Sequence, residues 1–124
     1  AGNLKERVYL ISDVAAKWYA EQLHETDQGK AIGLSYFKER GFTDETIKKF
    51  HLGYSPEQSA AFADYALANA YSDQALESSG ISMRNERGWY DRFRGRVMFP
   101  IHSISGRVLG FGGRILQSNA KAAK

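Results

Sequence analysis

Apolar residues recur at helical spacing from the N-terminus to about Gly80. In residues 4–24 they return every three or four positions, which is typical of an amphipathic helix; the main ones are Leu4, Val8, Ile11, Ala15 and Trp18. A second helix is predicted over residues 30–40, followed by Gly41 as a stop signal. We expect this second helix to point three side chains inward: Ile32, Tyr36 and Phe37.

Three further helices are predicted from local capping signals. Thr43 is a candidate N-cap for a short helix that runs to about His51, with acidic residues in its first turn. After a brief extended piece over 52–54, Ser55 is a second candidate N-cap, with Pro56 at the first position of a helix that reaches Ala70. Ser72 is the third candidate N-cap, at the start of a helix that ends before Gly80.

From Ile81 onward the spacing changes from helical to extended. Residues 85–88 predict a turn, and residues 90–116 predict a hairpin that turns at the Ser-Ile-Ser-Gly of 103–106. Helices over 4–80 followed by an antiparallel sheet over 81–116 indicate the α+β class. The length of 124 residues suits one domain spanning 1–124, with the small polar stretch 117–124 as a loose tail.

A register for the hairpin follows from its alternating pattern. If Ile101 pairs with Arg107 across a three-residue loop, with Gly106 in the left-handed region, the strands separate two kinds of side chain. One face is then apolar and carries Phe93, Val97, Phe99, Leu109, Phe111 and Ile115, of which the first five should be mostly buried. The other face carries Arg92, Arg94, Arg96, Gly110, Gly112 and Arg114, and its first three arginines should be mostly exposed.

A face of arginine beside glycine suits a phosphate backbone. Arginine presents fork-shaped donors, and glycine lets another backbone approach closely. Residues 1–83 carry 8 Lys+Arg against 12 Asp+Glu, whereas residues 84–124 carry 9 against 2, so that a net charge of −4 adjoins one of +7. This asymmetry indicates a polyanionic partner for the basic part. The alternative to a binding surface is an ordinary solvated strand face with surface arginines.

No catalytic constellation is visible in the chain. There is no cysteine, which excludes disulfides and thiolate metal sites, and the three histidines are isolated in sequence. Only Glu86 and Asp91 are acidic in the basic part, too few to hold Mg²⁺, and Asp91 is interpreted as a local turn or salt-bridge partner. No signal peptide or long apolar run indicates secretion or a membrane span.

The hairpin sequence resembles the bacterial DnaG-type DNA primase family. The resemblance is carried by YDRFRGRVMFPI at 90–101 and GRVLGFGGRIL at 106–116, and more loosely by AIGLSYFKERGFTDETIKKFHLGYSP at 31–56. It implies the first lobe of the RNA-polymerase core, between an N-terminal zinc ribbon and a metal-binding TOPRIM domain. The full enzyme of that family lays down short RNA primers on single-stranded DNA.

The family's motifs also imply site residues and partners. Its basic groove holds the template strand and the RNA primer hybrid, and its motif arginines fall on Arg40, Arg92, Arg94 and Arg114. With the strand pattern, the predicted nucleic-acid-binding set is Arg40, Arg92, Arg94, Arg96, Gly112, Gly113 and Arg114. At His102 and Ser103 the chain departs from the basic and Asp or Asn residues that the family often has.

The resemblance further implies a cytoplasmic, nucleoid-associated protein that meets a replicative helicase through the full-length chain. It implies Mg²⁺ and Zn²⁺ for the full-length enzyme, but neither for this chain, which is expected to bind nucleic acid without catalysing. Two other functions stay open. The basic sheet could dock an acidic protein partner, or Gly112, Gly113 and Arg114 could hold a nucleotide triphosphate.

Overall fold

The computed structural model describes residues 3–115, so the predicted tail at 117–124 and the hairpin's last residue, 116, lie outside it. Its helical elements are α1 (Leu4–Glu25), the π-helical η1 (Gly29–Leu34), α2 (Ser35–Glu39), α3 (Asp44–Lys49), α4 (Ala61–Ala68) and α5 (Asp73–Ser79). Its strands are β1 (Gly53–Ser55), β2 (Ser82–Asn85), β3 (Gly88–Asp91), β4 (Arg96–His102) and β5 (Val108–Ile115). The α+β class is confirmed.

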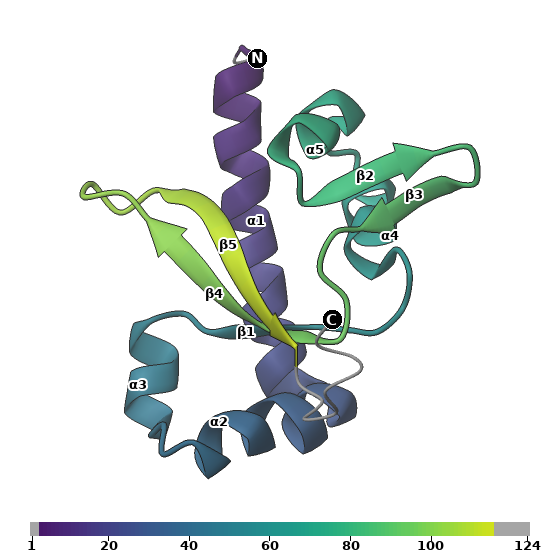
Figure 1. The fold of residues 1–124 in the computed structure, drawn as a ribbon. Coiled ribbons are helices and arrows are strands. Elements are labelled where there is room, and N and C mark those ends of the chain that lie inside the picture. Colours follow the sequence, from purple (N-terminus) through teal and green to yellow (C-terminus); the bar gives the residue numbers. More distant parts are fainter. Residues whose placement is uncertain (1–2, 116–124) are drawn as a thin grey trace.

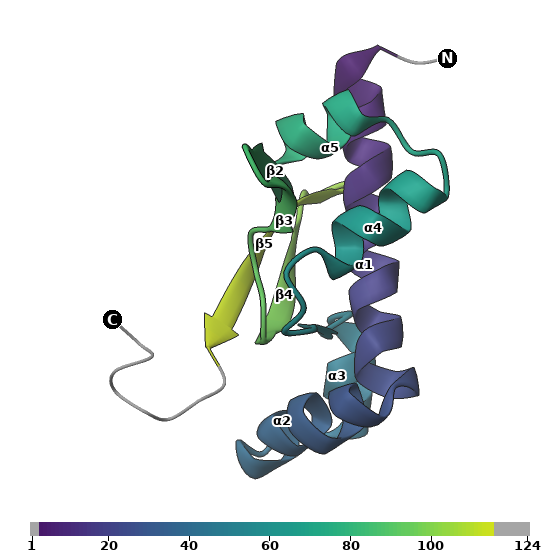
Figure 2. The same ribbon diagram turned by 90° about the vertical axis from the view of Figure 1, so that its right-hand side faces the viewer.

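Helix α1 is the longest element, and β1, β5, η1 and α5 pack against it (Figure 1). The antiparallel sheet β1-β4-β5 crosses one side of it, and the separate β2–β3 hairpin lies with α4 and α5 on its other flank. Turned by 90°, the strands lie to one side and α1 and α4 to the other (Figure 2). Within residues 3–115 no helix has the length and apolar character needed to cross a lipid bilayer.

Two buried clusters lie on opposite faces of β4. Met98 packs into the first cluster, with the middle of α1, α4 and α5, around Tyr19 and Phe62. Val97 packs into the second, with the end of α1, α2 and α3, around Phe37. Because neighbouring strand residues point to opposite faces, the adjacent pair Val97 and Met98 joins the two clusters through one strand.

Strand β1 crosses α1 in close contact at Gly53. A Cβ atom at this position would lie 2.6 Å from the Cβ of Tyr19 and 2.7 Å from its carbonyl carbon, closer than atoms can pack. Only glycine lets the strand reach this depth, where Tyr54 beside it is fully buried. The extended piece predicted here from sequence is confirmed.

Two of the three predicted helix caps are confirmed. The side-chain oxygen of Thr43 accepts from the Thr46 N–H at 3.1 Å, and that of Ser72 accepts from the Ala75 N–H at 3.1 Å. The prediction that Ser55 caps a helix is wrong, because Ser55 is buried in β1 and its Oγ donates to the Phe93 carbonyl at 2.6 Å. The prediction that Ile32 points inward is also wrong, since its side chain is 37% exposed.

The predicted hairpin register is wrong by three residues. Ile101 pairs with Gly110 rather than with Arg107, Phe99 with Gly112, and Val97 with Arg114. Two residues of this shift arise at the turn, where His102 pairs with Val108. The third residue of the shift arises at an irregularity in the pairing between Ile101 and His102. An odd shift exchanges the faces, so the predicted apolar set is split between both faces.

The first part of the predicted arginine strand is a loop. Strand β3 ends at Asp91 and β4 begins at Arg96, so Arg92 and Arg94 do not project from a sheet. Of the side chains expected in the core, Val97 is fully buried, whereas Leu109 is 54% exposed. Three others are half-buried: Phe93, Phe99 and Phe111.

Candidate nucleic-acid interface

The loop over 92–95 is fixed by three hydrogen bonds to distant parts of the chain. The Arg92 N–H donates to the Ile81 carbonyl at 2.9 Å, and the Gly95 N–H donates to the Pro56 carbonyl at 3.1 Å. Between them, the Phe93 carbonyl accepts from Ser55. The backbone is therefore held in place while the side chains of Arg92 and Arg94 remain exposed.

Arg94, Arg96 and Arg114 lie at or next to the end of the β4–β5 hairpin that is away from its turn, whereas the Arg92 side chain lies beside Gly80 and lines a small pocket with Gly110. Arg92 and Arg94 come from the loop just before β4, and the guanidinium carbon of Arg94 lies 6.0 Å from the centre of the Tyr90 ring. Arg96 opens β4 opposite Ile115, and Arg114 lies opposite Val97. Arg96 and Arg114 therefore point to opposite faces of the sheet, so the predicted single arginine face is wrong.

Arg40 lies on the same side of the sheet as Arg114. It ends α2, and its guanidinium carbon stacks 4.3 Å from the centre of the Tyr36 ring. Tyr36 belongs to the buried cluster that includes Val97, which is the residue paired with Arg114. Of the predicted site residues, Arg40 and Arg114 thus lie on one side of the hairpin end, and Arg96 lies on the other side.

The two predicted glycines have different surroundings. A Cβ atom on Gly113 would lie 2.6 Å from Cδ1 of Phe93 and 3.2 Å from Cδ of Arg96, so this glycine is required by packing. A Cβ atom on Gly112 would meet nothing within 4 Å. Only Gly112 leaves open space beside Arg114, which also weakens the case for a nucleotide triphosphate cradle built on both glycines.

Two of the nine arginines form ion pairs within residues 3–115, whereas the other seven, which include Arg7 and Arg87 outside the predicted site, form none. Arg84 pairs with Glu77 at 3.1 Å, and Arg107 pairs with Glu6 at 3.4 Å. Within residues 3–115, none of the predicted site arginines forms an ion pair; they are Arg40, Arg92, Arg94, Arg96 and Arg114. The Nε of Arg96 is buried and lacks a hydrogen-bond acceptor among the described residues. The positive charge at the hairpin end is thus left for an outside anion.

Asp91 has a structural role that sequence reasoning missed. Its carboxylate is buried and accepts from the N–H groups of Phe62 at 2.8 Å and Ala63 at 3.1 Å, and from the Ser82 hydroxyl at 2.8 Å. It therefore caps the N-terminus of α4, where no local side chain does so. Burial raises the pKa of Asp91, although these hydrogen bonds oppose the rise. The interpretation of Asp91 as a local turn or salt-bridge partner is wrong, because its carboxylate oxygens accept hydrogen bonds from Phe62, Ala63 and Ser82.

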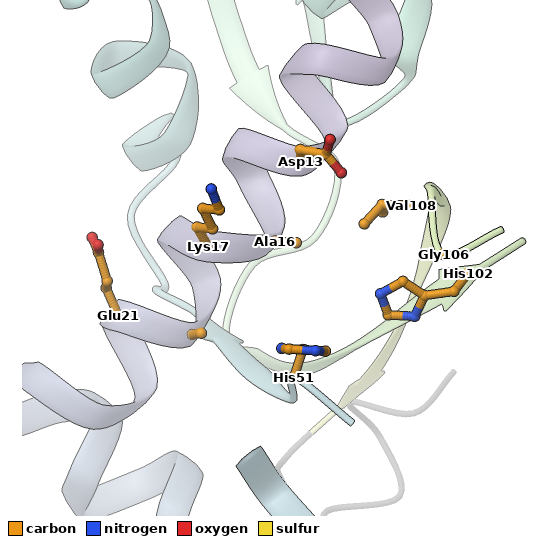
Figure 3. Close-up of a pocket in the computed structure, with 9 residues that line it drawn as sticks. Asp13, Ala16, Lys17, Glu21, His51, His102, Gly106 and Val108 are labelled. Carbon is orange, nitrogen blue, oxygen red and sulfur yellow. The ribbon is translucent and has the colours of Figure 1, made fainter. Parts of the chain in front are cut away.

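A cavity of about 540 Å³ brings together residues that are isolated in sequence (Figure 3). The rings of His51 and His102 lie 5.7 Å apart on one wall, and α1 presents Asp13, Lys17 and Glu21 on the other. Its lining mixes both signs of charge. No three His, Cys, Asp or Glu side chains within residues 3–115 come together in a way that could hold a metal ion.

Comparison with known proteins agrees with the α+β fold. Residues 18–124 match the family model described as the DNA primase catalytic core, N-terminal domain. The chain belongs to this family. The match includes all seven predicted site residues, from Arg40 to Arg114.

Curated DNA primases match this primase-family chain over most of its length. The protein from Synechococcus elongatus is 40% identical over 116 residues, and that from Streptomyces coelicolor is 41% identical over 116 residues. Each match covers 90% of this chain. The chain spans 16% of the first protein and 18% of the second, so these relatives are several times longer.

Solved primase structures share the fold. The RNA polymerase domain of Mycobacterium tuberculosis primase DnaG superposes with a TM-score of 0.84 at 30% identity, covering 92% of this chain and 36% of that one. A DnaG primase catalytic domain bound to single-stranded DNA gives 0.83 at 32% identity, covering 94% and 37%. The mixed helix-and-sheet architecture of this chain therefore matches that of one part of the solved primase domains.

Proposed function

We propose that this chain binds the single-stranded DNA template as the N-terminal lobe of a primase catalytic core. The observation that carries the proposal is the set of arginines without ion pairs at the hairpin end. Support also comes from the similar catalytic domain that binds single-stranded DNA, and from the Mycobacterium tuberculosis domain solved with a DNA duplex carrying a 6-nucleotide overhang.

In this proposal Arg92, Arg94 and Arg114 contact phosphates, Arg96 supports them, and Arg40 lies at the edge of the site. Gly112 lets the strand approach, whereas Gly113 serves packing against Phe93. Phosphate contacts position a strand without reading its sequence, so binding should be nearly independent of sequence. The spread of arginines over two sides of the hairpin end suits a strand that passes around this end.

The activity of the longer enzyme is part of the same proposal. It would join ribonucleotides into short RNA primers on the template, in the cytoplasm at the replication fork, with a replicative helicase as a partner. Mg²⁺ and Zn²⁺ do not fit residues 3–115, which bring no three metal-ligating side chains together, and the chain has no cysteine. The metals would be held by other parts of the longer protein, and this chain alone would make no primers.

The test is a titration of labelled single-stranded DNA into the parent chain and Arg94→Ala at several salt concentrations. We expect the logarithm of the binding constant to fall linearly with the logarithm of salt, and Arg94→Ala to reduce this slope by about 0.7. Arg107→Ala is the matched control, because it removes the same charge from the hairpin turn, where Arg107 already pairs with Glu6.

Two outcomes would contradict the proposal. Equal slopes for the parent and Arg94→Ala would remove Arg94 from the interface. A loss of affinity confined to particular DNA sequences would mean that the arginine reads bases and does not hold phosphates. If the basic sheet instead docks an acidic protein, affinity for single-stranded DNA should not rise with the length of the DNA. A groove for an extended strand needs several nucleotides, so the proposed function predicts that affinity does rise with length.

A further inference from the structure

Tyr90 is a half-buried aromatic residue that packs into neither core cluster. On β3, Asp91 is buried and pairs with buried Ser82, which fixes the inner face of the β2–β3 hairpin. By strand alternation Tyr90 and its pairing partner Met83 lie on the opposite, outer face. Among residues 3–115, neither of the two buried clusters includes Tyr90, although Trp89 beside it packs against the first.

Tyr90 and its pairing partner Met83 make up a small platform on the outer face of the hairpin, beside Arg94. The Tyr90 hydroxyl lies 4.0 Å from the Met83 sulfur, and the guanidinium of Arg94 lies over one face of the ring, 6.0 Å from its centre, so a base would stack on the other face. Both Met83 and Tyr90 remain half-exposed. Arg84, on the inner face of the same hairpin, differs from Arg94 in having an acidic partner within residues 3–115. It stacks on Trp89 at 4.7 Å and forms an ion pair with Glu77.

We infer that Tyr90, with Met83 beside it, stacks against one base of the strand whose phosphate Arg94 holds. The inference rests on the function proposed above and adds a second kind of contact to it. A base of a single strand offers an open π-face to an aromatic side chain, whereas a paired base inside a duplex does not. The platform would therefore favour single-stranded over duplex nucleic acid, without choosing among the four bases, since every base has such a face.

Stacking and phosphate contact can be separated with two oligonucleotides of equal length and charge. One carries thymine at every position, and the other is abasic throughout its central residues. The parent chain should bind the thymine strand about five- to a hundredfold more tightly than the abasic strand, the range that stacking on one aromatic side chain provides. Both strands should show the same dependence on salt, because they carry the same phosphates.

Two variants of the full chain then test the platform. Tyr90→Leu removes the ring but keeps an apolar side chain, and it should abolish the preference for the thymine strand while leaving affinity for the abasic strand unchanged. Tyr90→Phe keeps the ring and should preserve the preference. Circular dichroism of both variants checks that the fold is retained.

Each result decides between the two proposals. If Tyr90→Leu lowers affinity for both strands equally, or leaves the preference intact, the platform is wrong while the phosphate role of Arg94 stands. If Tyr90→Phe also loses the preference, the hydroxyl and not the ring makes the contact, and stacking is wrong. If neither strand binds in a salt-dependent way, the proposed function itself fails and the platform fails with it.

Discussion

The carboxylate of Asp91 accepts a hydrogen bond from the backbone N–H of Phe62 at 2.8 Å, across 29 residues of sequence. This bond joins the end of β3, just before the arginine loop, to the first turn of α4. A helix leaves its first N–H groups without partners, and here a distant acidic residue provides the acceptor. The position of the arginine loop therefore depends on the packing of α4.

Replacing Asp91 should destabilise the chain. In Asp91→Ala three buried donors lose their acceptor, so we expect the free energy of unfolding to fall by about 2–4 kcal/mol. Ser82→Ala removes only one of the three donors and should cost about 1 kcal/mol. Urea unfolding of both variants measures this difference, and equal losses would mean that Asp91 does not act as the cap.

The effect of Asp91 on stability should depend on pH. Burial raises its pKa in the folded chain above the ordinary value of 3.8, so the folded state binds more protons than the unfolded state between these two values. The contribution of Asp91 to stability is therefore greatest below pH 3.8 and falls as pH rises to its folded pKa. The measurement is the difference in free energy of unfolding between the parent and Asp91→Asn, from acid to neutral pH. A difference that grows in favour of the parent as pH rises would contradict a raised pKa for Asp91.

Alanine at the two adjacent glycines should have unequal effects. Gly113→Ala forces the new methyl group against the Phe93 ring and should cost about 1–3 kcal/mol. Gly112→Ala enters open space and should change the free energy of unfolding by less than about 0.5 kcal/mol. If Gly112 gives a DNA strand room to approach, this second variant should weaken DNA binding while its melting temperature stays at the parent's value. Equal melting temperatures for both variants would mean that the Phe93 ring does not pack against Gly113.

The hairpin register can be tested with one buried and one exposed side chain. Val97→Ala removes a fully buried side chain and should cost about 2–3 kcal/mol. Leu109 is 54% exposed, so Leu109→Ala should cost less than about 1 kcal/mol. Thermal unfolding of the two variants compares them directly. A large loss at Leu109 would favour the register expected from the alternating pattern over the one in the structure.

Features set by neighbouring residues could be predicted from the sequence. The caps at Thr43 and Ser72 depend on bonds that reach only three residues ahead, and Gly80 takes the left-handed conformation (φ +76°) expected after a helix. The change from helical to extended spacing near Ile81 marks the start of β2 within one residue. Family motifs pointed to Arg40, Arg92, Arg94 and Arg114, which form no ion pair among residues 3–115.

Features set by distant residues could not be predicted in this way. Ser55 carries a good capping signal, but the Phe93 carbonyl 38 residues away takes its hydroxyl. The hairpin register depends on the turn and on an irregularity next to His102. Neither feature alters the alternation of apolar and polar residues in the sequence, so the alternation could not reveal the register. A three-residue error then reversed the faces and suggested one arginine surface where the structure has two sides.

The long-range cap on α4 also bears on the order in which the chain folds. Helix α1 has 22 residues and its own cap at Asn3, so its first turn does not depend on a distant residue. Helix α4 has eight residues, and no local side chain caps it, which leaves it marginal in water by itself. Its first turn gains a lasting acceptor only when Asp91 has been made and β3 has docked. The middle of the chain must therefore wait for a later segment before it becomes ordered.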